Sequence, residues 1–383
     1  MNFDRIIDRR ETESIKWNYF DEDVLPMWVA DMDFQSPPEV IDVLQERVAH
    51  GIFGYGGAPA GTRSAICHHL EKHHHWHVDP DKIHFISGVV TGFTHAIYSL
   101  TDPGDVVLVQ TPAYPPFLAA PESTGRQIVI NELEQEADGR YVVDFDDFES
   151  KIASGVRLFI LCNPQNPTGR VFRQDELTRI AEICLRHETL ICSDEIHSDL
   201  IYPGEQHIPI ASLSPEVGQN TVTYFAPSKT FNVAGFSTSV YVAENPEIQN
   251  TLSKSMRLLL GHPNILGLHA ARAAYQHGGD WLAALMRYLQ ANRDFLADFV
   301  RDELDGISLW RPEGTYLAWL DCRDLALELP PQKFFLEQAR VGLNDGADFG
   351  AAGEGFVRLN FGCPRDLLEV GLTRMKAALA ERN

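Results

Sequence analysis

Residues 224–235, YFAPSKTFNVAG, place a Ser-Lys pair directly after an apolar run, TVTYFA at 221–226, that has the composition of a buried β-strand. Lysine is normally a surface residue, so Lys229 has two interpretations. The strand ends there and the chain returns to solvent, or the amine is kept away from water and becomes a nucleophile toward carbonyl groups. For an isolated Ser-Lys pair the first interpretation is the more common one, so other parts of the chain must decide.

The bulk composition restricts the class of protein. The chain has 383 residues, more than one compact domain usually holds, so we expect a large and a smaller domain. Its net charge of −22 disfavours binding to nucleic acid or to an anionic membrane surface. No apolar run approaches the ~20 residues of a membrane span. Scattered cysteines without a Cys-x-x-Cys pair, and a charged start without an apolar signal core, predict a reduced, cytoplasmic protein.

Apolar runs alternate with amphipathic helical stretches along the chain. We expect helices at 37–51 and 174–188, and strands at 105–110, 156–162, 189–195, 221–226 and 237–243. A strand, a helix and a strand of these lengths form a parallel pair, and unbroken apolar strands indicate a sheet that is covered on both faces. The pattern therefore predicts an α/β fold with a large, doubly wound, mostly parallel sheet.

A second domain is expected after the Gly278-Gly279 pair, where a long helix at 280–304 is followed by an α+β mixture. We predict that residues 50–278 form the large domain. The smaller α+β domain is predicted to combine residues 1–49 with residues 279–383.

Polar residues follow the expected strands at the point where each strand ends, which is where open α/β sheets bind ligands. Each is weak evidence alone, because an Asn-Pro-Thr-Gly stretch is usually a turn and an acid after a strand is usually a solvated cap. Their convergence on one sheet edge nevertheless predicts a site. The residues are Gly88 after KIHFIS, Tyr114 after DVVLVQ, Asn166 after VRLFILC, Asp194 and His197 after TLICS, and Lys229 after TVTYFA.

The order of these motifs resembles the fold-type I pyridoxal 5′-phosphate (PLP) enzymes, whose fold is that of aspartate aminotransferase. The resemblance rests on NPQNPTG at 163–169, the Asp-Glu pair at 194–195, the Ser-Lys pair at 228–229 and a late arginine in VRLNFGCP, and it runs over nearly the whole chain. Flanking stretches are similar to the MalY/PatB type of cysteine-S-conjugate and cystathionine β-lyases. They are RRETESIKW (9–17), PMWVADMDF (26–34), SDEIHSDL (193–200), SKTFNVAG (228–235) and GFVRLNFGCPR (355–365).

The resemblance implies a role for each cofactor-binding residue. Lys229 would bind PLP covalently and, once substrate displaces it, remove the Cα proton. Asp194 would pair with the pyridinium nitrogen, an attraction of about 4 kcal/mol at ~4 Å and an effective dielectric of ~20. Asn166 would donate to the phenolic oxygen of the cofactor, Tyr114 would stack on its ring, and His197 would stand beside it where many aminotransferases have a tyrosine.

Two further sets of contacts are implied in the same way. The helix start at Gly88, Val89 and Val90, together with Ser228, matches the phosphate cradle, because free amides and the helix dipole attract an anion. Arg358 matches the bidentate clamp for the substrate α-carboxylate. Tyr55, in FGYGGAP, matches a tyrosine that reaches the phosphate in the neighbouring subunit, so the resemblance implies a homodimer with shared sites.

The function implied is a PLP-dependent C–S β-lyase that converts cystathionine or another cysteine S-conjugate to pyruvate, ammonia and a thiol. An aminotransferase that uses the same residues is the alternative, and the pocket for the far end of the substrate cannot be read from the sequence. Ser237 stands where many aminotransferases have a phosphate-binding arginine, which favours the lyase. A regulator would be expected to carry a basic DNA-binding domain, and this acidic chain offers none.

A histidine-rich stretch, CHHLEKHHHWH at 67–77, suggests a metal site because His69 and His73 have the i, i+4 spacing of helical ligands. Short histidine patterns of this kind are often false positives for metal sites. We therefore expect no metal.

Overall fold

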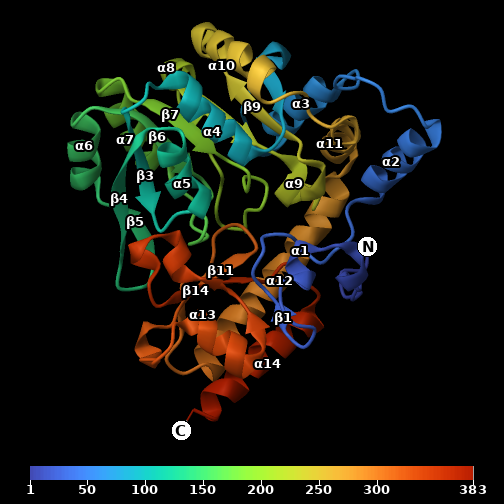
Figure 1. Cartoon of the computed structure of the whole chain (residues 1–383), viewed down its shortest axis with the longest axis vertical. Helices are drawn as coiled ribbons and strands as arrows, with labels where there is room; N and C mark the ends of the chain where they lie inside the picture. Colours follow the sequence, from blue (N-terminus) through green and yellow to red (C-terminus); the bar gives the residue numbers. More distant parts are fainter. Residues whose placement is uncertain (383) are drawn as a thin grey trace.

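The computed structural model describes residues 1–382 and shows a large sheet flanked by helices above a smaller sheet (Figure 1). Within these residues the large sheet has eight strands in the order β2-β9-β8-β7-β6-β3-β4-β5. Only β9 and β5 run against the common direction. The predicted α/β fold with a mostly parallel sheet is thereby confirmed. The strands are β2 (Ile83–Ile86), β3 (Val106–Thr111), β4 (Gln127–Gln135), β5 (Tyr141–Val143), β6 (Val156–Cys162), β7 (Leu190–Asp194), β8 (Thr221–Phe225) and β9 (Ser239–Ala243).

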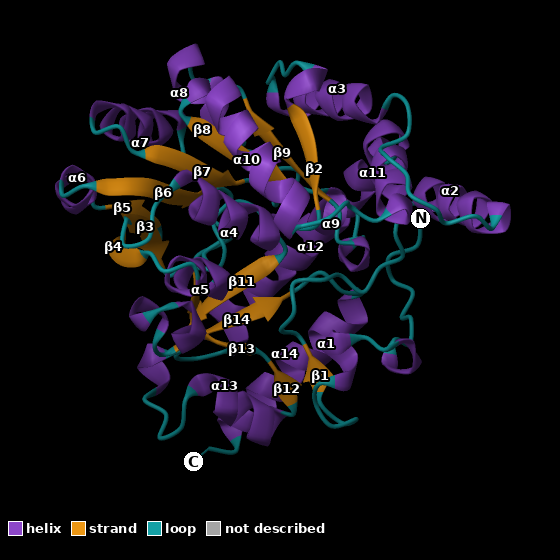
Figure 2. Cartoon of the chain, turned by 45° about the horizontal axis from the view of Figure 1, so that its top comes forward, coloured by secondary structure: helices purple, strands orange, loops and turns teal. Residues whose placement is uncertain are grey.

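Helices cover both faces of this sheet because alternate side chains of its central strands face opposite cores. In β6, Leu158 and Ile160 pack in the core beneath α4, α5 and α10, whereas Phe159 and Leu161 pack beneath α6 and α7. Figure 2 shows the helices around the strands. They are α3 (Thr62–His74), α4 (Val89–Leu100), α5 (Pro115–Ser123), α6 (Phe145–Ala153), α7 (Gln174–Arg186), α8 (Pro215–Gln219), α9 (Pro227–Thr230), α10 (Pro246–Leu259) and α11 (Ile265–His277).

The smaller part contains a four-stranded antiparallel sheet in the order β10-β11-β14-β13. The long helix α12 runs from the large sheet into this part and packs there against α14 (Figure 1). None of the described helices is long and apolar enough to cross a membrane. The elements are β10 (Ser308–Leu309), β11 (Leu317–Asp321), β12 (Val341–Gly342), β13 (Asn344–Asp345), β14 (Phe356–Asn360), α12 (Gly279–Glu303), α13 (Pro331–Phe334) and α14 (Arg365–Ala380).

The N-terminal residues contact both parts. Helix α1 (Ile15–Asn18) and strand β1 (Leu25–Pro26) lie on the small part, where β1 pairs with β12. Helix α2 (Pro38–His50) packs instead on α11 (Figure 1). The predicted domain boundaries, at 49/50 and 278/279, stay a prediction.

Residues 27–34, which we call the crossing segment, run between the two parts and are bonded to each. On the small part, Asn360 Nδ2 donates to the carbonyls of Val29 and Asp31 at 2.6 and 2.7 Å. On the large part, the Asn232 side chain accepts from Met32 N at 3.0 Å and donates to the carbonyls of Met32 and Phe34 at 2.9 and 2.7 Å. The segment therefore joins the small sheet to the loop that follows α9, the short helical turn that carries Lys229.

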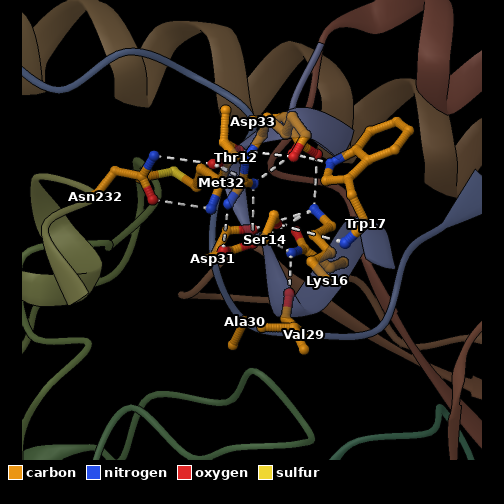
Figure 3. A network of polar contacts seen from close by, with 12 residues as sticks. Thr12, Ser14, Lys16, Trp17, Val29, Ala30, Asp31, Met32, Asp33 and Asn232 are labelled. Carbon is orange, nitrogen blue, oxygen red and sulfur yellow. Dashed lines mark hydrogen bonds and ion pairs between the residues drawn. The ribbon is translucent and has the colours of Figure 1, made fainter. Parts of the chain in front are cut away.

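Asp33 is the centre of a buried polar network that fixes the crossing segment (Figure 3). Its carboxylate, 3% exposed, accepts from Lys16 Nζ at 2.7 Å, Arg9 at 2.6 Å and Trp17 Nε1 at 2.8 Å. Burial alone would raise the pKa of Asp33, but Lys16 and the other donors hold it below its ordinary value. Because Lys16 is only 1% exposed, the two charges depend on each other to remain inside the protein.

We predict that Asp33→Asn lowers the free energy of unfolding by roughly 3 kcal/mol at neutral pH. This loss is at the low end of the range for breaking a buried ion pair. The Asp31 carboxylate remains 3.8 Å from Lys16 Nζ and still partly offsets the charge of the lysine. Because folding depresses the pKa of Asp33, the advantage of the wild type should be present above about pH 4 and shrink as the pH falls further. Urea unfolding followed by circular dichroism measures it, with exposed Asp302→Asn as the control. Equal stability of wild type and Asp33→Asn at neutral pH would contradict this role.

Candidate active site

A cavity of about 480 Å³ lies where the carboxyl ends of β6, β7 and β8 face the small sheet. Tyr55 is the one predicted site residue outside it, and its side chain is fully exposed in the segment between α2 and α3. The others all line the cavity: Gly88, Val89, Val90, Tyr114, Asn166, Asp194, His197, Ser228, Lys229 and Arg358. The structure therefore brings together the polar residues that were singled out at the strand ends.

Lys229 sits on the short helical turn α9, which begins with Pro227 immediately after β8. Its Nζ donates to the carbonyl of Ala30 in the crossing segment at 2.7 Å. Burial, assisted by the nearby Arg358, lowers the pKa of Lys229 to about 8, although Asp31 and Asp194 act in the opposite direction. A substantial fraction of the amine is therefore neutral near physiological pH and can attack a carbonyl or accept a proton.

Asp194 ends β7 and lies between Cys162 of β6 and Tyr224 of β8 in the strand register. Its Oδ1 accepts from the backbone N–H of Ile196 at 3.0 Å. Burial raises the pKa of Asp194 to about 7. A cationic ring nitrogen placed against this carboxylate would offset the burial and keep it ionised, which is the pairing that PLP requires.

His197 and Tyr114 supply ring surfaces and polar atoms to the same cavity. Burial, with help from Lys229 and Arg358, holds the pKa of His197 well below its ordinary value, so the imidazole is neutral. Its Nδ1 is buried and has no hydrogen-bond partner among the described residues. Tyr114 caps the start of α5 and is half-buried, with its ring edge-on to Phe117.

The start of α4 forms an anion cradle at one end of the cavity. Gly88 precedes the helix with a φ of 113°, a conformation that strains any residue with a Cβ, and no side chain caps the helix. The first N–H groups of α4 are thus available to a ligand, and the helix dipole favours a negative one. Three serines besides Ser228 also line the cavity: Ser87, Ser237 and Ser239.

Arg358 enters the cavity from the middle of β14, in register with Trp319 of β11 and Asn344 of β13. Its guanidinium donates to Asn166 Oδ1 at 2.9 Å, Asn344 Oδ1 at 2.6 Å and the Trp28 carbonyl at 3.0 Å. Burial lowers the pKa of Arg358 to about 10, so it remains cationic at neutral pH. Its Nε has no hydrogen-bond partner among the described residues, so the guanidinium still has N–H groups that can donate to a carboxylate.

These groups fit PLP and an amino acid in their chemistry. A partly neutral amine, a buried carboxylate that forms no ion pair among the described residues, and a helix start without a side-chain cap match the aldehyde, ring nitrogen and phosphate of the cofactor. Arg358 adds a site for an α-carboxylate. Sequence reasoning missed the carbonyls of Trp28 and Ala30 and the side chain of Asn344, and nothing in their residue types distinguishes them.

Comparisons with known proteins cover almost the full chain. A family model for class I and II aminotransferases matches residues 22–375. Cystathionine beta-lyase PatB from Bacillus subtilis (strain 168) is 42% identical over 99% of this chain and 100% of its own. The structure of cystalysin from Treponema denticola, which contains a PLP cofactor, has a TM-score of 0.96 and 32% identity, covering 100% of this chain and 99% of that one. The PLP-bound C-S lyase from Staphylococcus hominis has a TM-score of 0.94 and 34% identity, with 100% of both chains covered.

The lowered pKa of Lys229 predicts that its amine is half neutral near pH 8 in the cofactor-free protein. An amine is neutral above its pKa, so the rate at which an acylating reagent modifies Lys229 should rise through about pH 8 and then level off. Mass spectrometry of the Lys229 peptide measures this rate. A midpoint near ~10.4, the ordinary value for lysine, would show that the amine is not desolvated.

Proposed function

Because this chain belongs to the class I and II aminotransferase family, we propose that it is a PLP-dependent C–S β-lyase. It eliminates the thiol from cystathionine or another cysteine S-conjugate and releases pyruvate and ammonia. With cystathionine, the thiol is homocysteine. The observation that carries the proposal is the convergence of Lys229, Asp194 and Arg358 on one cavity, in a chain that matches C–S lyases over its whole length.

When bound, PLP withdraws electrons from the substrate Cα and so permits loss of the Cα proton and then of the thiolate at Cβ. Lys229 holds the cofactor and, once displaced by substrate, takes the Cα proton with its neutral amine. Its pKa of about 8 is suited to this task, since an ordinary lysine would be almost fully protonated at neutral pH. Asp194 keeps the ring nitrogen cationic, and the start of α4 with Ser228 binds the phosphate.

Arg358 binds the substrate α-carboxylate and thereby sets the direction of the Cα–H bond. Its guanidinium is already oriented by Asn166 and Asn344, so little conformational freedom is lost on binding. With PLP bound, Tyr114 would stack on the cofactor ring and Asn166 would donate from its amide nitrogen to the phenolic oxygen, while His197 would offer a neutral imidazole. The resemblance to PLP enzymes implies these roles, and the presence of all three side chains at one cavity supports them.

An aminotransferase is the alternative function, and it would use the same lysine, aspartate and arginine. The two reactions differ in where Lys229 delivers its proton. Delivery to the leaving sulfur favours elimination, whereas delivery to the C4′ carbon of the cofactor favours transamination. Ser237 and His197, which replace the arginine and tyrosine of many aminotransferases, support the lyase.

The proposal includes a homodimer with shared sites, acting in the cytoplasm. Tyr55 is fully exposed and lies away from the cavity of its own chain, so it is available to the phosphate site of a second copy. Ile52 and Phe53 beside it, and Val90 at the cavity, are exposed apolar residues that a partner would cover. All six cysteines are free thiols, which suits a reducing compartment.

Product analysis tests the proposed function. With cystathionine as the sole substrate, we expect pyruvate, ammonia and homocysteine in equal amounts, and no product from a Lys229→Ala variant above the enzyme-free rate. Chromatography and mass spectrometry identify the products. A 2-oxo acid that still carries the sulfur substituent would contradict elimination and support the aminotransferase.

Arg358→Lys is expected to weaken substrate binding strongly while leaving the visible spectrum of the bound cofactor intact. Lysine keeps the charge but loses the two-pronged fit, a loss of about 1.5–3 kcal/mol, so KM should rise roughly 10- to 100-fold. Steady-state kinetics with an S-conjugate measure this change. Arg323→Lys, at an exposed position outside the cavity, is the matched control. A KM near that of the wild type would rule out Arg358 as the carboxylate clamp.

A further inference from the structure

A buried acid is bonded to the turn that carries Lys229 and does not line the cavity. Asp199 follows β7, and its Oδ1 accepts from His69 Nε2 at 2.7 Å and from His74 Nε2 at 3.0 Å. Its Oδ2 accepts from the hydroxyl of Thr230 at 2.9 Å. Thr230 is 1% exposed and is the residue next to Lys229 on α9. One carboxylate therefore joins helix α3 to the turn that carries the lysine.

The Asp199 carboxylate accepts bonds from His69, His74 and Thr230, although burial lowers the pKa of His74 itself. Burial would raise the pKa of Asp199, but His69 and His74 hold that pKa well below its ordinary value, so the group is an anion. Other titratable groups surround this pair of histidines: His73, whose ring lies 4.5 Å from that of His69, Tyr275 of α11, whose ring lies 4.9 Å from His69, and His207, whose ring lies 5.2 Å from His74 and which pairs with Glu195. Hydrogen bonds to an ionised acceptor are stronger than neutral ones and resist rearrangement.

The same three side chains offer ligand atoms within 4.8 Å of one another, so a metal ion is the competing explanation. The sequence drew attention to His69 and His73, but the structure turns His74 rather than His73 toward His69 and Asp199. The separations of 2.7 and 3.0 Å are those of N–H···O bonds. A metal-bound histidine usually donates its second N–H to an acceptor. Among the described residues, no hydrogen bond involves Nδ1 of His69 or of His74. Hydrogen bonding alone accounts for the cluster.

We propose that Asp199 is a positioning residue for Lys229, acting through Thr230, with His69 and His74 fixing its carboxylate. This inference rests on the proposed role of Lys229. Asn232, two residues after the turn, bonds to the crossing segment and fixes the chain there. Asp199 and Asn232 together set the direction of a four-residue turn too short to be stable alone. Such precision matters because a displacement of ~1 Å at a reacting group can cost a factor of about 100 in rate.

Removal of the Asp199 carboxylate would leave two imidazoles unpaired in the core, so a substitution there can prevent folding. Thr230 gives a cleaner test. Thr230→Val keeps the shape and removes the donor, whereas Thr230→Ser keeps the donor. Thr221→Val is the matched control, since Thr221 is an equally buried threonine whose hydroxyl bonds to the Val217 carbonyl, far from α9 in the fold.

Two quantities are measured on each holoenzyme: kcat and KM with an S-conjugate, and the pH midpoint of the visible absorbance of the bound cofactor. We expect Thr230→Val to lower kcat at least about tenfold with KM within about twofold, and to move the pH midpoint. Thr230→Ser should restore both, and Thr221→Val should change neither. Unaltered kcat and midpoint in Thr230→Val would overturn the proposal, as would equal effects in Thr221→Val.

Two measurements on the wild-type protein come first, because they test which lysine binds the cofactor and whether the cluster holds a metal ion. Borohydride reduction followed by peptide mapping should place the pyridoxyl group on Lys229. A label on another lysine, such as Lys254, would overturn the proposed role of Lys229 on which this inference rests, whereas an unaffected Thr230→Val overturns only the positioning role. Elemental analysis of the holoenzyme should find no stoichiometric divalent metal. One bound metal per chain, lost in His69→Gln, would show that the cluster is a metal site and would overturn the proposal.

Discussion

The ion pair between Asp33 and Lys16 is the constraint on which the site depends, because it fixes the backbone that connects the two parts of the chain. With Arg9 and Trp17, it holds residues 27–34 in one place (Figure 3). The carbonyls of Ala30 and Trp28 in this segment accept from Lys229 and Arg358. The lysine comes from the large sheet and the arginine from the small one, so a single buried carboxylate helps to align the two side chains that the proposed chemistry uses.

The ionisable side chains inside the cavity are buried, and a ligand can supply the charged partners that they lack. Burial brings the pKa of Lys229 to about 8 and that of Arg358 to about 10, and it raises the pKa of Asp194 to about 7. Each pKa shift means that the charged form of the side chain is poorly stabilised by the protein alone. A cationic ring nitrogen, a phosphate and a substrate carboxylate would supply the missing partners. A ligand would thus bind where buried charges lack partners, and strongly shifted pKa values are common at functional sites.

The parts of the fold and site that could be predicted are those that produce a recognisable pattern within a short stretch of sequence. The apolar run at 156–162 is β6, and the helix expected at 174–188 is α7, which ends two residues earlier at Arg186. Polar residues at strand ends located Asn166, Asp194 and Lys229, since parallel strands end at one edge of a sheet. Their assigned roles stay predictions.

Other features had no local pattern. The carbonyls of Trp28 and Ala30 could not be predicted because every residue has one, and their direction follows from distant bonds to Asn360 and Asn232. The i, i+4 spacing drew attention to His69 and His73, but it could not show that His74, at the last position of α3, points to Asp199. Tyr55 stays untested, because its predicted partner lies on a second chain.

The number of pyruvate molecules formed per active site tests the central claim most directly, when holoenzyme is mixed with excess cystathionine and no 2-oxo acid. We expect many turnovers, with pyruvate rising until the substrate is consumed, because elimination returns the cofactor to its starting form. A single turnover that stops, with the pyridoxamine form of the cofactor persisting until a 2-oxo acid is added, would contradict the lyase and identify an aminotransferase.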